Sequence, residues 1–144
     1  MLSRDEDPAF CERRPTSRKR EATLTADLVT IAAGAASAKT VEPTVVIEVG
    51  DLIAITEYFV ISSGSNDRQV RAIAEEVERQ VKDNGGSSPR AIEGLDDARW
   101  VLMDFGDFVV HVFSDEARRF YDLERLWSDA PRLAWDAKRD RVEA

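Results

Sequence analysis

The sequence predicts a small single α/β domain with a mixed β-sheet packed against helices. Two observations indicate this fold class. Short β-branched segments alternate along the chain with helical patterns. In addition, residues 99–113 have the pattern of a β-hairpin. The chain has 144 residues, 43% of them hydrophobic, which is enough for one core. We expect the order α-β-β-α-β-β-β-α, with a weak strand around Ala91–Glu93.

The N-terminal half begins with an extension. Residues 1–22 have mixed charge, two prolines and no periodicity, so we expect them to be disordered. A start codon assigned too far upstream would explain them equally well. A helix is expected from Thr25, and two strands are expected at Val45–Val49 and Tyr58–Ser62. The predicted apolar stripe of the helix consists of Leu24, Leu28, Ile31, Ala35 and Ala38.

A second, stronger helix is expected after the second strand. Asn66 is its predicted N-cap, Gln69 is the capping-box partner, and Asn84-Gly85-Gly86 ends it. Its predicted buried stripe is Val70, Ile73, Ala74, Val77 and Val81. A last helix is expected to begin after Ser114 and to end at Pro131, anchored by Phe120, Tyr121, Leu123, Leu126 and Trp127.

The hairpin at residues 99–113 has two unlike faces. One is wholly apolar and consists of Val101, Met103, Phe105, Phe108, Val110 and Val112. The other carries Trp100, Leu102, Asp104, Asp107, Val109, His111 and Phe113. A two-residue loop at Phe105-Gly106 would place Asp104 opposite Asp107 and Trp100 opposite His111. This second face is either a partly covered core or a surface that contacts a partner.

Charge is unevenly distributed along the chain. Residues 23–127 carry ten basic and nineteen acidic side chains, within a whole-chain net charge of −8. Such a body is poorly suited to nucleic-acid backbones, whose binding depends on Lys and Arg, and is well suited to a basic protein partner. Acidity that merely aids solubility is the simpler alternative. No apolar run could span a membrane, the N-terminus does not resemble a secretory signal, and a single Cys11 cannot form an internal disulfide, so we expect a cytoplasmic protein.

Enzymatic function has little support in the sequence. The stretch Ser62-Ser63-Gly64-Ser65 before a helix resembles an anion cradle, but it lacks the spacing of a phosphate loop. Asp104, Asp107 and His111 could hold a metal ion, although a lone strand histidine is more often a packing residue. We therefore expect no catalytic residues, no metal and no cofactor. The alternative is a metal-dependent nucleotidyltransferase that uses this Asp/His cluster.

Three blocks together resemble the ribosomal silencing factor (Iojap) family. They occur in the family's order between Thr25 and Trp127, and they are Tyr58–Val70, Trp100–Asp107 with Val110–Phe113, and Phe120–Trp127. The chain departs from the usual pattern at Glu57, where the family usually has Asp, and at Ser62-Ser63, where a small apolar residue often precedes the serine. The resemblance implies a nucleotidyltransferase-like architecture in a binding protein. It also implies docking on the large ribosomal subunit through the ribosomal protein numbered fourteen, which blocks joining of the small subunit and represses translation under nutrient limitation.

The resemblance also implies which residues bind the partner. Trp100, Asp104 and Asp107 are the principal candidates, an aromatic anchor with acids that could pair with Arg or Lys. The remaining candidates are His111, Tyr58 and Arg68. The expected organisation is an N-terminal extension over 1–22, the silencing-factor domain over 23–127 and a polar tail over 128–144. A homodimer is a further possibility.

Overall fold

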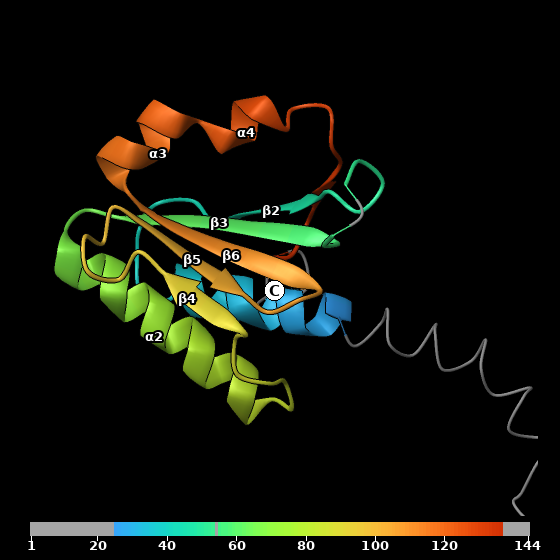
Figure 1. The fold of residues 1–144 in the computed structure, drawn as a ribbon, viewed down its shortest axis with the longest axis horizontal. Helices are drawn as coiled ribbons and strands as arrows, with labels where there is room; N and C mark the ends of the chain where they lie inside the picture. Colours follow the sequence, from blue (N-terminus) through green and yellow to red (C-terminus); the bar gives the residue numbers. More distant parts are fainter. Residues whose placement is uncertain (1–24, 54, 137–144) are drawn as a thin grey trace, which may run out of the picture.

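The computed structural model describes residues 25–53 and 55–136, which form one six-stranded sheet with helices on both sides (Figure 1). The strands lie in the order β4-β5-β6-β3-β2-β7. Their bounds are β2 Val45–Glu48, β3 Tyr58–Gly64, β4 Ala91–Glu93, β5 Trp100–Asp104, β6 Phe108–Ser114 and β7 Arg132–Leu133. A first helix over 25–37 is followed by α2 (Asp67–Asp83), α3 (Asp115–Tyr121) and α4 (Leu123–Leu126).

The sheet is mixed, as the sequence predicts. β3 and β6 are parallel neighbours at its centre, and every other pair is antiparallel. A parallel pair needs a crossover, which here contains α2, β4 and β5. The predicted α/β class is therefore confirmed, and so is the predicted order of elements as far as the end of β6, including the weak strand at Ala91–Glu93.

The two faces of the sheet have different covers. The helix over 25–37 and α2 cover one side, here called the lower face, whereas α3 and α4 cover the other, the upper face (Figure 1). The lower face holds the larger core, and the apolar side of the hairpin belongs to it as predicted. The predicted buried stripe of α2 is also confirmed, residue by residue.

The hairpin register differs from the prediction by two residues. Trp100 lies opposite Phe113 and Leu102 lies opposite His111, and the two-residue loop is Gly106-Asp107. The reason is local: Gly106 has φ +91°, which Phe105 would adopt only with strain. Because strand side chains alternate with a period of two, the shift leaves the strand residues on their predicted faces, whereas Asp107 moves from the strand into the turn.

Residues 25–37 are helical, as predicted from Thr25 onward, but the buried stripe agrees with the prediction only in part. Its fully buried residues are Val29, Ala32, Ala33 and Ala36. Of the predicted stripe, Ala35 is buried, Leu28 and Ile31 are partly buried, and Ala38 is exposed. Leu24 of the predicted stripe lies outside the described residues. The buried residues are mostly small, so the backbone of this helix can lie close to the sheet. Close packing on the sheet, and not the positions of the larger side chains, therefore decides which side of this helix is buried.

The N-cap of α2 is close to the prediction. Asn66 Oδ1 accepts a hydrogen bond from the Gln69 N–H at 2.8 Å, as an N-cap does. Gln69 Oε1 accepts a hydrogen bond from the Ser65 N–H at 2.6 Å. A capping box would have placed this oxygen on the N–H of Asn66, one residue later. Asn84-Gly85-Gly86 ends the helix, with Gly85 at φ +95°.

The C-terminal region departs most from the prediction. The last helix is divided at Asp122, whose φ of +48° ends α3 before α4 begins. Leu123 and Trp127 pack into the upper-face core, but Phe120 and Leu126 of the predicted anchors are exposed. Residues 128–136, expected as part of a tail, include β7 and the buried Trp135, whose Nε1 donates to the Thr44 carbonyl at 2.8 Å. The sheet therefore extends past residue 127, while residues 1–22 lie outside the described part.

Candidate partner-binding site

Trp100 lies at the start of β5, where the upper face meets α3. Its indole is half-buried, with ring centroids 5.0 Å from Phe113 and 4.7 Å from Tyr121. Its Nε1 donates to His111 Nδ1 at 3.0 Å. Trp100 is thus partly under a helix and partly open, which fits an aromatic side chain that both packs and contacts a partner.

His111 lies behind Trp100 and is 4% exposed. Burial lowers its pKa to about 4, so the imidazole is neutral at pH 7. Since Nδ1 accepts from Trp100, the ring proton is on Nε2, a buried atom with no hydrogen-bond partner among the described residues. The Phe59 ring lies edge-on at 4.7 Å. His111 is therefore placed to orient the indole of Trp100 and not to meet a partner directly.

Asp104 ends β5 on the same face as Trp100. One of its oxygens, Oδ1, accepts from the Gly106 N–H at 2.8 Å, and Arg90 lies 3.3 Å away on the rim. The carboxylate is half-buried, and its ion pair with Arg90 involves a largely exposed guanidinium. Such an exposed pair is weak, so Asp104 can exchange Arg90 for a cation on a partner.

The other predicted contact residues lie elsewhere. Tyr58 points to the lower face. Its pKa is raised, mainly by burial and to a smaller extent by the nearby negative charges of Glu48 and Glu57. Asp107 is exposed in the hairpin turn, with Oδ2 3.4 Å from Thr25 Oγ1 of the first helix. Arg68 is exposed in the first turn of α2, beside an open hollow. The structure thus brings Trp100, Asp104 and His111 together on the upper face and separates Tyr58, Asp107 and Arg68 from them.

An uncovered part of the upper face adjoins Trp100. Strand pairing places five side chains there, here called the open strip: Ala91, Glu93, Leu102, Asp104 and Val109. Ala91 and Glu93 are exposed, and the other three are half-buried. Sequence reasoning missed Ala91 and Glu93 because only the register between β4 and β5 places them beside Leu102 and Asp104. The result is a shallow apolar floor bordered by two acids.

The side chains of the possible metal site and of the predicted anion cradle are not arranged for either role. Leu102, not an acid, lies opposite His111, and the described residues contain no group of three His, Cys, Asp or Glu side chains placed to hold a metal. In the predicted anion cradle, Ser63 Oγ accepts from Arg118 at 2.9 Å and Ser62 Oγ accepts from Thr44 at 3.2 Å. The Ser65 N–H donates to Gln69. These contacts tie the ends of the strands to their neighbours.

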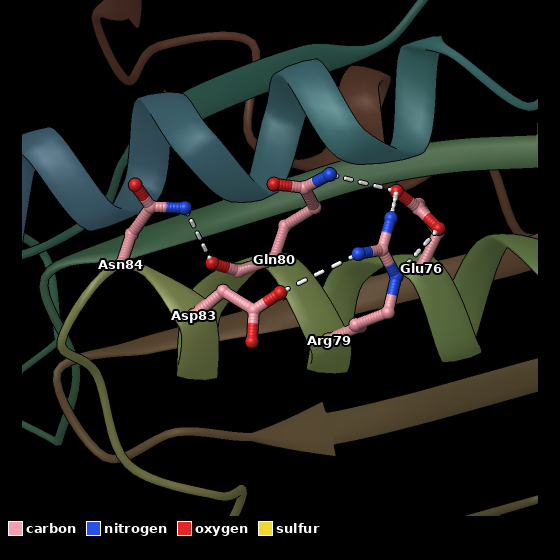
Figure 2. Close-up of polar contacts among 5 residues, drawn as sticks. All are labelled: Glu76, Arg79, Gln80, Asp83 and Asn84. Carbon is pink, nitrogen blue, oxygen red and sulfur yellow. Dashed lines mark hydrogen bonds and ion pairs between the residues drawn. The ribbon is translucent and has the colours of Figure 1, made fainter.

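The exposed flank of α2 is a further charged region. Figure 2 shows Arg79 between Glu76 and Asp83, with Gln80 also donating to Glu76. The hydrogen bond from Gln80, followed by that from Arg79, lowers the pKa of Glu76. These contacts lie within one helix and join residues three and four positions apart, so they stabilise α2 itself.

Comparison with known proteins identifies the class. The chain matches the family model described as ribosomal silencing factor during starvation over residues 22–144. It is 43% identical over 104 residues to the ribosomal silencing factor RsfS of Bacillus subtilis, covering 72% of this chain and 87% of that protein. A crystal structure of a Chromobacterium violaceum protein superposes with a TM-score of 0.67 at 29% identity, covering 71% of this chain and 84% of that one.

A more distant relative is a mouse protein named mitochondrial assembly of ribosomal large subunit protein 1. It is 38% identical over 85 residues, which cover 58% of this chain and 37% of that protein. The class is therefore that of ribosome-associated regulators of translation. This chain belongs to the ribosomal silencing factor family, as its sequence resemblance indicated. Among the described residues, no helix has the length and apolar character needed to cross a bilayer.

Proposed function

We propose that this protein binds the large ribosomal subunit through its ribosomal protein number fourteen and blocks joining of the small subunit, repressing translation under nutrient limitation. The observation that carries the proposal is the upper-face site, where an aromatic anchor held by His111 stands beside the acid-bordered open strip. Ribosomal proteins are generally basic, and an acidic surface favours encounter with them. The family's match to a starvation silencing factor and the mouse relative's name both support a ribosomal partner.

The residues have graded roles in this proposal. Trp100 is the anchor, Asp104 pairs with a cation of the partner, and His111 orients the indole. Tyr58, Asp107 and Arg68 lie off the upper face, so they contribute at the edge of the contact or through the shape of the domain. Asp107 is the best placed of the three because it lies in the hairpin turn, three residues after Asp104.

Co-sedimentation with separated ribosomal subunits tests the proposal. The protein should pellet with large subunits and not with small ones, and its presence should reduce light scattering from subunits that are mixed to re-form whole ribosomes. Pelleting with neither subunit, or undiminished joining at saturating protein, would refute it.

Charge reversal tests the position of the site. Asp104→Lys should slow association with the large subunit and change its salt dependence, because like charges are brought together. The matched control is Glu75→Lys, which makes the same change in net charge on the exposed side of α2. Equal loss in both variants would show that overall charge matters and that the open strip does not.

A further inference from the structure

We infer that the partner-binding surface continues from Trp100 onto α3 and α4, where Phe120 and Leu126 form a second, apolar contact with the same large-subunit protein. This inference rests on the proposed function and extends it to residues that lie outside the open strip. Phe120 is 76% exposed and Leu126 is 72% exposed, on either side of the bend at Asp122. A single exposed apolar side chain is ordinary on a protein surface, but Phe120 is connected through Tyr121 to Trp100.

A continuous row of rings connects Phe120 to the anchor. The Phe120 ring meets Tyr121 edge-on at a centroid distance of 5.0 Å, and Tyr121 lies 4.7 Å from Trp100. Exposure rises along this row, from the buried His111 through the half-buried Trp100 and Tyr121 at 45% to Phe120. A partner surface that covers Trp100 from the side of α3 therefore meets Tyr121 and Phe120 next.

The exposed side chains of this segment differ from those of the open strip. Phe120 and Leu126 are apolar and exposed, whereas the open strip carries two acids, Glu93 and Asp104. The open strip therefore suits a cationic part of the partner, while Phe120 and Leu126 suit an apolar part. We assign to the second contact an apolar patch of the ribosomal protein, next to the basic residues that face Asp104.

The side chain of Arg118 holds this segment in place. Arg118 of α3 donates to the Pro43 carbonyl at 2.7 Å and to Ser63 Oγ at 2.9 Å, and it pairs with Glu124 of α4 at 3.0 Å. The Arg118 side chain is 11% exposed, and its bonds to Ser63 and Glu124 are partly shielded from water. The exposed side chains of α3 and α4 thus stand on a fixed support, which limits the entropy lost on binding.

The test compares three variants of the full chain for binding to purified large subunits. Phe120→Ser combined with Leu126→Ser should weaken binding by about tenfold or more, since both side chains would lose apolar contact. Its melting temperature should stay close to wild type because neither residue packs in the core. Ile55→Ser is the matched control, an 82% exposed residue before β3 that should bind as wild type does. Trp100→Ala reports on the anchor itself.

The outcomes separate this inference from the proposed function. Full binding by the Phe120/Leu126 variant together with weakened binding by Trp100→Ala would overturn the second contact and leave the proposed function standing. Absence of wild-type binding would overturn both. Light scattering should give the same molar mass for wild type and the variant. A fall in mass without a change in binding would assign these residues to a second copy of the chain and overturn the inference.

Discussion

The two faces of the same sheet differ in what their side chains do. On the lower face, mostly aliphatic side chains such as Val, Ala and Met fill the space under the 25–37 helix and α2. On the upper face, aromatic rings, an imidazole and an Asp–Arg pair lie under a shorter cover that leaves the open strip free. The lower face supplies stability through close packing, and the upper face retains polar and exposed groups suited to recognition.

Polar groups without partners show the same division. The described residues have three buried side-chain polar atoms without a hydrogen bond, in Thr56, His111 and Asp115, and His111 is part of the upper-face core. A buried unsatisfied group costs roughly 1–3 kcal/mol. The upper face thus carries a stability cost at the residue that orients the proposed anchor.

Truncation on the lower face should have the largest effect on stability. Met103→Ala is expected to lower the free energy of unfolding by about 2–5 kcal/mol, because Met103 is fully buried and its loss leaves a cavity. Urea denaturation measures this, and binding of the remaining folded protein to large subunits should be unchanged. A loss below about 1 kcal/mol would mean that the lower face is loosely packed.

Protonation of His111 should have the next largest effect on the free energy of unfolding. Its pKa of about 4 in the fold lies below the ordinary value of 6.5, so the unfolded chain takes up the proton first as pH falls. The domain should lose about 3 kcal/mol between pH 6.5 and pH 4, where each pKa unit is worth about 1.4 kcal/mol, and this loss should level off below pH 4.

The control for this prediction is His111→Phe. Other groups also titrate in this range, so the informative quantity is the difference between wild type and His111→Phe in unfolding free energy as a function of pH. That difference should change across pH 4–6.5. If the two proteins have parallel pH profiles, His111 is not buried as the structure places it.

Truncation of the anchor should affect binding more than the lower-face change does. Trp100→Ala is expected to weaken binding to the large subunit by roughly 2 kcal/mol, as buried aromatic anchors do. It should also reduce stability by less than Met103→Ala, since Trp100 is only half-buried. Trp100→Phe keeps a ring between Phe113 and Tyr121 but removes the N–H to His111, so it should bind with intermediate affinity. Binding at wild-type strength by Trp100→Ala would place the contact on another face.

The smallest expected effect concerns the bend between α3 and α4. Asp122→Gly should raise the free energy of unfolding by roughly 0.5 kcal/mol, because glycine adopts φ +48° without strain and this gain exceeds its entropic cost. Thermal unfolding measures the change, and Asp122→Ala is the control, since alanine retains the strain. If glycine lowers stability below that of alanine, the bend is not the conformation of lowest energy for this segment.

Elements governed by local periodicity agree best with the sequence. The stripe of α2 and the two faces of the hairpin follow from repeats of 3.6 and 2, which survive small errors of position. The hairpin register was wrong because it depends on which residue takes the positive φ of the turn. The stripe of the first helix was wrong in part, although Ala35 is buried as predicted, because small side chains, and not large ones, let that helix approach the sheet.

The sequence by itself determined the class of fold, the order of its elements as far as β6, the acidic character and, through three short blocks, the family. Each depends on residue types and spacings within a segment. Only the tertiary structure decided that His111 supports Trp100 from inside, that Tyr58 faces the other way, and that β7 joins the sheet while Trp135 joins the core. These facts depend on pairing and packing between residues far apart in the chain, which no local pattern of side chains specifies.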